Sequence, residues 1–115
     1  MIAIYHNPLW SKSRKSVEIL EEKGLSHTII EYMKEGLSIE ALEKISKQLN
    51  LSPAHFIRKT DKTFRENQLE SILHNDKEVF KAISENPKLL ERPIVIKGNK
   101  AIIARPAELL YDFLL

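Results

Sequence analysis

The hydrophobic pattern begins with a short apolar run, Ile2-Ala3-Ile4-Tyr5, that stops at Asn7-Pro8. Such a run followed by a turn signal predicts a buried strand. Apolar residues then recur at helical spacing as far as Lys23-Gly24. This segment therefore predicts a helix that Ser11 or Ser13 caps at its start and that the glycine ends.

A second strand and a helical region are expected next. Residues 27–32 are rich in β-branched side chains and predict a strand parallel to the first, because a helix connects the two. Apolar residues then recur at helical spacing from Ser38 to Asn50, and again from Asp76 to Asn86-Pro87. Between these two helices we expect a short helix at residues 52–57, a polar loop at 58–62 and an apolar turn at 69–73.

The last part of the chain predicts a β-hairpin. Two apolar runs, Ile94–Ile96 and Ala101–Ala104, flank a Gly98-Asn99 turn. Arg105-Pro106 then begins a final amphipathic helix. The order of elements predicts the α/β class with a mixed sheet, and a length of 115 residues fits one domain over residues 1–115.

Composition and charge exclude several functional classes. The chain is 43% hydrophobic and 30% charged, and it contains no run of the roughly 20 apolar residues that a membrane span needs. We expect a cytoplasmic protein without membrane association, since the amino terminus shows no leader pattern. A net charge of +2 does not favour direct nucleic-acid binding, and the Lys59–Arg65 stretch is interpreted as a solvated loop.

The chain contains no cysteine. It therefore has no disulfide, thiolate nucleophile, cysteine-ligated zinc or cysteine-held iron–sulfur cluster. Its four histidines lack the close paired spacing of a zinc site, so we expect no metal. These histidines are His6, His27, His55 and His74.

Four segments carry a family resemblance that covers nearly the whole chain. The first joins Tyr5-His6-Asn7-Pro8 to Ser13-Arg14, and the others are Ile57-Arg58-Lys59, Glu91–Val95 and Ala104-Arg105-Pro106. Together, and in this order, they resemble the glutaredoxin-linked arsenate reductase family, which also includes Spx-like transcription regulators. The resemblance implies a thioredoxin-like fold, a mixed four-stranded sheet with helices on both faces, and a helical insertion at about residues 38–86.

The resemblance also implies a set of site residues. In that family, a cysteine in the pattern Tyr-His-Asn-Pro-x-Cys-x-x-Ser-Arg attacks arsenate, glutathione displaces the adduct, and arginines hold the oxyanion. The cysteine position falls on Trp10 of this chain. The other positions fall on His6 as the helper histidine, on Arg58, Arg92, Arg105 and Ser13 as oxyanion ligands, and on Pro93 as the proline expected to be cis.

Each of these residues also has a structural interpretation. Trp10 either fills the former pocket and stacks on Arg92 or Arg105, or it packs as an ordinary loop aromatic. The three arginines either hold an oxyanion or form separate solvated ion pairs. His6 follows a buried strand and is more simply explained as a structural histidine.

Three functional hypotheses follow. We prefer a family member without thiol-dependent reductase activity, because an indole is no nucleophile and a neighbouring serine cannot form a mixed disulfide. Such a protein requires no cofactor and could keep a weak oxyanion or glutathione site. The alternatives are an Spx-like protein-interaction or transcription-regulatory module, and a reductase that works by a different group.

Overall fold

The computed structural model describes all residues from 1 to 115. The chain forms two compact units, one made of Met1–Glu35 with Arg92–Leu115 and the other of Gly36–Glu91. The first unit contains the sheet, and the second consists of helices and turns. No helix in either unit has the length and apolarity that crossing a membrane requires.

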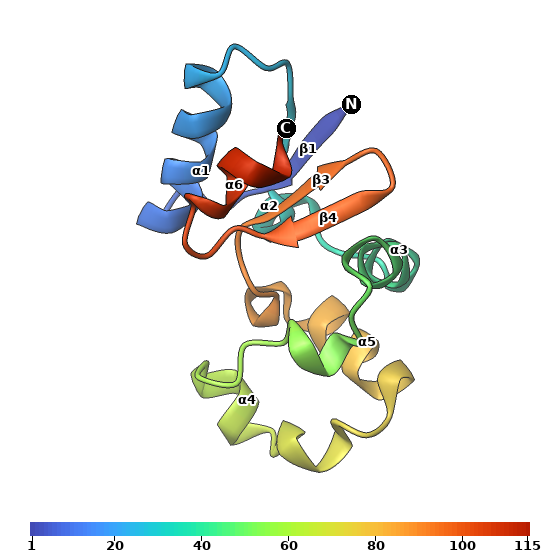
Figure 1. Ribbon diagram of the computed structural model, residues 1–115. Helices are drawn as coiled ribbons and strands as arrows, with labels where there is room; N and C mark the ends of the chain where they lie inside the picture. The colour runs from blue at the N-terminus through green and yellow to red at the C-terminus, as the bar shows by residue number, and fades with distance from the viewer. The chain divides into compact units, whose positions relative to one another are not determined.

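A mixed four-stranded sheet forms the centre of the first unit (Figure 1). Its strands are β1 (Ile2–Tyr5), β2 (Thr28–Ile30), β3 (Ile94–Lys97) and β4 (Lys100–Ile103), in the order β2-β1-β3-β4. β1 is parallel to β2 and antiparallel to β3, and β3 pairs with β4 as a hairpin. The four predicted strands, the parallel first pair and the hairpin are confirmed.

Two predicted boundaries in this unit are wrong. The second strand ends at Ile30 rather than at residue 32. The carbonyl of Glu31 accepts the N–H of Glu35, and the N–H of Glu31 donates to the side chain of Glu35. These bonds begin α2 (Tyr32–Glu35) directly after the strand. The final helix, α6, spans Leu109–Phe113 and does not begin at Arg105. Pairing in the hairpin continues as far as Ala104, whose N–H donates to the carbonyl of Pro93 over 2.9 Å.

The first helix, α1 (Ser11–Glu22), begins without a serine cap. Trp10 occupies the N-cap position and makes no capping hydrogen bond with its side chain. The predicted cap at Ser13 is wrong because that hydroxyl turns inward and accepts the N–H of Asn7. At the other end, Gly24 takes φ +66° and the N–H of Leu25 reaches the carbonyl of Leu20, so the predicted glycine stop is confirmed.

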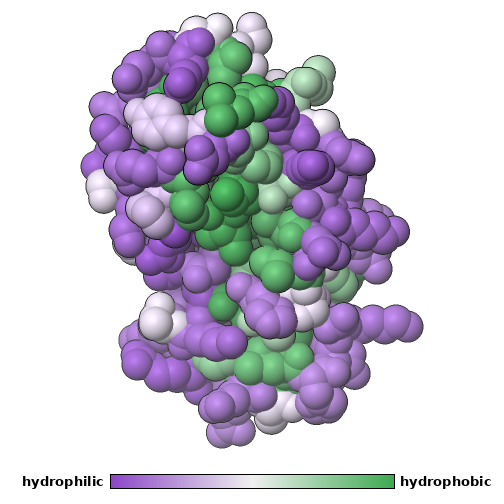
Figure 2. Space-filling model, in the orientation of Figure 1, coloured by the Kyte–Doolittle hydropathy of each residue, from purple (hydrophilic) through white to green (hydrophobic).

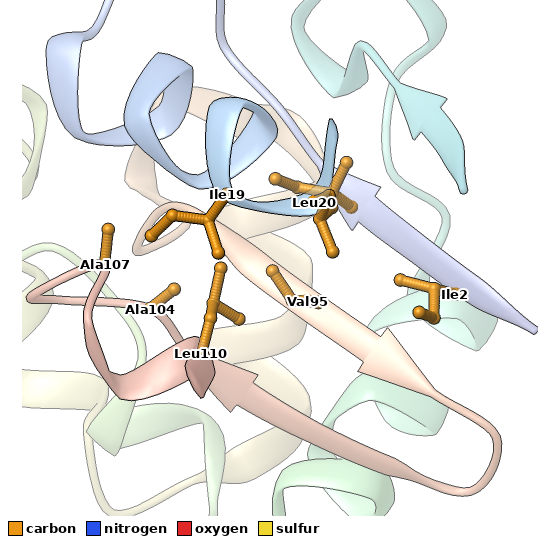
Figure 3. Close-up of a cluster of buried hydrophobic side chains, with 8 residues drawn as sticks. Ile2, Ile19, Leu20, Val95, Ala104, Ala107 and Leu110 are labelled. Carbon is orange, nitrogen blue, oxygen red and sulfur yellow. The ribbon is translucent and has the colours of Figure 1, made fainter. Parts of the chain in front are cut away.

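A cluster of apolar side chains joins α1 and α6 to one face of the sheet. In Figure 3, Ile19 of α1 and Leu110 of α6 point toward each other, with Val95 of β3 beside them. The buried members are Ile2, Ile4, Ile19, Leu20, Val95, Ala104, Ala107 and Leu110. This contact holds α1 against the sheet.

The Gly36–Glu91 unit is built mainly from α3 (Ile39–Leu49) and α5 (Asp76–Glu85), which pack against each other. Ser38 caps α3 by accepting the N–H of Ala41, and Asn50 ends it in the left-handed conformation, as predicted. Short elements connect the two helices and follow α5. They are η1 (Pro53–His55), α4 (Lys62–Glu66), η2 (Leu69–Ile72) and η3 (Pro87–Leu89).

The stretch interpreted as a solvated loop at residues 59–65 is partly helical. Asp61 accepts the N–H of Thr63 over 2.8 Å and so starts α4. Thr63 and Phe64 are buried, whereas Lys59, Lys62 and Arg65 stay exposed.

Several large apolar side chains remain at the surface of the first unit. Leu9, Trp10, Ile29 and Met33 are all exposed. Figure 2 shows hydrophobic groups reaching the surface between hydrophilic ones. Of these four residues, Leu9 and Trp10 are adjacent in the loop that precedes α1.

Replacing Leu110 with alanine should destabilise the fold by about 2–5 kcal/mol, because the side chain is fully buried and leaves a cavity. Leu109→Ala is the matched control, since its neighbour on the same helix is exposed and should change stability by no more than about 0.5 kcal/mol. Urea unfolding of both variants measures the difference. Equal losses would show that α6 does not pack on the sheet as described.

Candidate functional site

One end of the sheet gathers most of the predicted site residues. Tyr5, the last residue of β1, pairs with Ile94, the first residue of β3, and Ile94 pairs with Ile103 at the end of β4. The loop after β1, the residues before β3 and the residues after β4 therefore lie at the same end. Arg92 and Arg105 are thus brought to opposite positions of one hairpin end, although 13 positions separate them in the sequence.

The loop between β1 and α1 is fixed by its own hydrogen bonds. The side-chain oxygen of Asn7 accepts the N–H of Leu9 over 3.1 Å, and its backbone carbonyl accepts the N–H of Trp10 over 3.1 Å. This turn conformation is one that asparagine favours. Asn7 is buried. The turn that it closes leads directly to Trp10 at the start of α1.

Trp10 stacks on Arg92. The guanidinium carbon of Arg92 lies 3.6 Å from the centre of the Trp10 rings, so of the alternatives for this residue the structure shows the cation–π contact, with Arg92 as the cation. Arg92 is only 5% exposed, whereas Trp10 is 45% exposed. The indole therefore covers a buried cation while presenting part of its own surface to solvent. Such a contact contributes about 0.5–2 kcal/mol, with larger values where the cation is desolvated.

His6 is held by Ser13 beneath this loop. Its Nδ1 lies 2.6 Å from the Oγ of Ser13, and both residues are buried. Since Ser13 Oγ already accepts the N–H of Asn7, its own proton is available for Nδ1, which favours the neutral ring with hydrogen on Nε2. Burial lowers the pKa of His6, Glu31 opposes that effect, and Arg14 adds to it.

Arg105 and Pro93 complete this end of the sheet. Arg105 is exposed and its backbone N–H donates to the carbonyl of Ile103 over 2.9 Å. The Arg92–Pro93 peptide bond is cis, and so is Arg105–Pro106. Pro93 is buried at the start of β3, where its carbonyl accepts the N–H of Ala104.

Arg58 belongs to the Gly36–Glu91 unit and is engaged there by carboxylates. Its guanidinium lies 3.0 Å from the carboxylate of Asp61 and 3.8 Å from that of Glu91. Burial raises the pKa of the Asp61 carboxyl, but hydrogen bonds from Thr63 and the charges of Lys88 and Arg58 bring it below its ordinary value. Much of the charge of Arg58 is therefore balanced within its own unit.

A groove along α1 is a feature that the sequence interpretation missed. It has a volume of about 650 Å³ and is lined by His6, Ser11, Lys12, Arg14, Lys15, Val17, Glu18 and Glu21. The sequence does contain a signal for this groove. Along α1 the cations come first and the carboxylates follow them. No three His, Asp or Glu side chains of the chain come together in a way that could hold a metal ion.

Comparisons with known proteins agree on one family. The model of the ArsC family matches residues 5–113. An arsenate reductase of Haemophilus influenzae is 40% identical over 98% of this chain and 98% of its own length. An uncharacterized protein of Escherichia coli, YfgD, is 33% identical over 93% of this chain and 91% of its own.

Solved structures support the same fold. A putative arsenate reductase from Yersinia pestis superposes with a TM-score of 0.92 at 31% identity, over 97% of this chain and 99% of that one. An arsenate reductase from Vibrio cholerae gives the same TM-score at 35% identity, over 96% and 95% of the two chains. The predicted thioredoxin-like α/β class with a mixed four-stranded sheet is confirmed.

The lowered pKa of His6 predicts a pH dependence of stability. In the unfolded chain the imidazole takes up a proton near its ordinary pKa of 6.5, whereas the folded protein keeps it neutral to lower pH. Acidification from about pH 7 to about pH 5 should therefore lower the free energy of unfolding, because the unfolded state binds the extra proton.

Urea unfolding over this pH range measures that slope, and His6→Gln is the comparison because it keeps a polar side chain without the titration. The variant should show a shallower slope than the wild type between pH values of about 7 and 5. Identical slopes would mean that the ring titrates equally in the folded and unfolded states.

Proposed function

This chain belongs to the ArsC family, and on that premise we propose that it is a noncatalytic member that does not reduce arsenate by the thiol route. The observation that carries the proposal is the residue at the nucleophile position. By the sequence pattern that position falls on Trp10, which stacks on Arg92, and the chain has no cysteine elsewhere.

The chemistry of the thiol route explains why this residue is decisive. The route needs a thiolate that attacks the oxyanion and a sulfur that exchanges with glutathione. An indole supplies one N–H donor and no nucleophile near neutral pH. Ser13 is fully buried and bonded to His6, and the hydroxyl of the exposed Ser11 cannot enter a disulfide.

A weak oxyanion site is the second part of the proposal. It would use Arg92 and Arg105 at the end of the hairpin, next to the start of α1, where backbone N–H groups favour anions. Trp10 covers one face of Arg92, so an anion must compete with the indole for this end of the sheet. Arg58 is a poorer ligand because Asp61 and Glu91 already pair with it.

Glutathione is a further ligand of the same proposed site. Its carboxylates could pair with the guanidinium groups of Arg92 and Arg105. It would bind as a ligand only, since no sulfur of this chain can react with it. A cytoplasmic location is part of the same proposal.

A protein-interaction role of the Spx-like kind is the alternative, and one observation favours it. Leu9 is 84% exposed and Trp10 45% exposed, and the two residues are adjacent in the hydrogen-bonded loop before α1. Aromatic residues are enriched in protein interfaces. A partner that binds this loop would bury both side chains.

Restoring sulfur tests the loss of chemistry. The wild-type protein should form no arsenite from arsenate with glutathione and glutaredoxin. The Trp10→Cys thiol should have a pKa below the usual value of about 8.5, because it would lie at the start of α1. Leu9→Cys is the matched control, since it places a thiol one residue earlier in an exposed position.

The pH dependence of iodoacetamide alkylation gives both thiol pKa values, and arsenite production gives the activity. Turnover by the cysteine-free protein would contradict the proposed inactivity. Equal thiol pKa values in the two variants would contradict the role assigned to the start of α1.

Uncovering Arg92 tests the oxyanion site. Trp10→Ala should raise the affinity for arsenate or phosphate several-fold, because it removes the indole that competes with the anion. Trp10→Phe keeps an aromatic ring and should remain close to the wild type, and Arg92→Met should abolish the gain when it is added to Trp10→Ala. Isothermal titration calorimetry measures all four proteins, and equal affinities throughout would exclude a site at Arg92.

A further inference from the structure

One ring nitrogen of His6 is a hydrogen-bond donor that no group of the chain engages. The hydroxyl of Ser13 holds Nδ1 and supplies the proton of that bond, so Nε2 carries the ring hydrogen. His6 is only 7% exposed, and a donor on such a buried side chain normally has a partner. Nε2 is not among the side-chain atoms that are both enclosed and unbonded, so this nitrogen reaches open space.

That space is the groove along α1. His6 lines the groove, which has a volume of about 650 Å³, within the usual range for sites that bind small molecules. Ile2 and Ile4 of β1 pack on the side of α1, and His6 continues their alternation, so its ring also points toward this helix. The bond to Ser13 places the ring at the first turn of α1. The Nε2–H therefore opens into the groove at the start of the helix.

Arg14 supplies a fixed positive charge at the same end. Its Nη1 donates to the carbonyl of Pro8 over 2.9 Å, which holds the guanidinium beside the loop and leaves its other N–H groups available. Arg14 lines the groove, and its charge lowers the pKa of His6, so the two side chains lie close together. The first turn of a helix also favours negative charge. This end of the groove thus combines a neutral donor with a cation.

The remainder of the groove has a different character. Val17 is half-buried and supplies an apolar wall. Glu18 and Glu21 also line the groove, about 6 Å and about 10 Å farther along the helix than Arg14. Glu31 lies near enough to His6 for its charge to raise the pKa of the ring. A second negative charge on a ligand would therefore be repelled.

We propose that this groove binds a small organic monocarboxylate. The carboxylate accepts the Nε2–H of His6 and pairs with the guanidinium of Arg14, and the apolar part of the ligand lies against Val17. This site is separate from the oxyanion site proposed above, because none of Trp10, Arg92 and Arg105 lines the groove.

Other small ligands fit these groups less well. A cation would meet Arg14, and the Nε2–H of His6 could not accept a hydrogen bond from it. A phosphate with two charges would bring additional negative charge toward Glu18 and Glu31. Water competes for the same donor, so we expect a weak site with a dissociation constant of about 1–10 mM.

Hexanoate is the probe that tests the site, because it joins one carboxylate to an apolar chain. Imidazole nitrogen NMR spectra of the full-length protein should show a saturable shift of His6 Nε2 as hexanoate is added. His27, His55 and His74 are internal controls whose ring nitrogens should not shift, since none of them lines the groove. Adipate has the same six-carbon chain with a second carboxylate and should bind several-fold more weakly than hexanoate.

A matched pair of variants makes the test specific. Arg14→Met should weaken hexanoate binding about tenfold or more, because it removes the charged hydrogen bonds to the carboxylate. Lys44→Met removes an exposed cation of α3, outside the groove, and should leave the affinity unchanged. Thermal unfolding of both variants should match that of the wild type, since both side chains are exposed.

Three results would overturn this site. The first is no shift of His6 Nε2 at hexanoate concentrations up to about 50 mM. The second is equal affinity for hexanoate in Arg14→Met and the wild type, and the third is adipate binding as tightly as hexanoate. Binding that is lost in Arg105→Met but kept in Arg14→Met would place the carboxylate at the end of the hairpin, which would support the oxyanion site and exclude the groove.

Discussion

The stack of the Trp10 indole on the Arg92 guanidinium is the contact on which the interpretation of this molecule depends. It joins the start of α1 to the start of β3, two segments that are brought together only by the pairing of β1 with β3. A buried guanidinium retains its charge, and an aromatic face can stabilise that charge without supplying a counter-ion. The same contact therefore stabilises this end of the sheet and separates Arg92 from the solvent.

A few buried polar groups hold the loop beside that stack through hydrogen bonds. Asn7 closes the turn before the helix, and Ser13 joins the backbone of Asn7 to the ring of His6. His6, Asn7 and Ser13 are all buried. A buried donor or acceptor without a partner would lower the stability of the fold, so these hydrogen bonds favour this one arrangement of the loop. These hydrogen bonds hold the loop that leads from β1 to Trp10 at the start of α1.

Much of the fold could be predicted from the sequence, because its signals are local. Ser38 and Asn50 mark the ends of α3, and the Gly98-Asn99 turn marks the hairpin. The errors arose where a distant contact overrides a local preference. Ser13 resembles a helix cap, but its hydroxyl bonds inward to His6 and Asn7. Arg105-Pro106 resembles a helix start, but it forms a bend between the hairpin, whose pairing ends at Ala104, and α6.

The site was predicted only in part. A contact of Trp10 with an arginine was one of two alternatives that the sequence left open, and the choice of Arg92 depended on strand register. The engagement of Arg58 by Asp61 and Glu91 could not be predicted, since one of its partners lies 33 positions away along the chain.

Trp10 is also the single tryptophan of the chain. The tryptophan fluorescence of the protein therefore arises from one residue, and that residue touches a buried cation. Any molecule that displaces the ring from Arg92 would change the local field and hydration of the fluorophore. The protein thus contains a built-in optical reporter for this end of the sheet, which can be followed without labels.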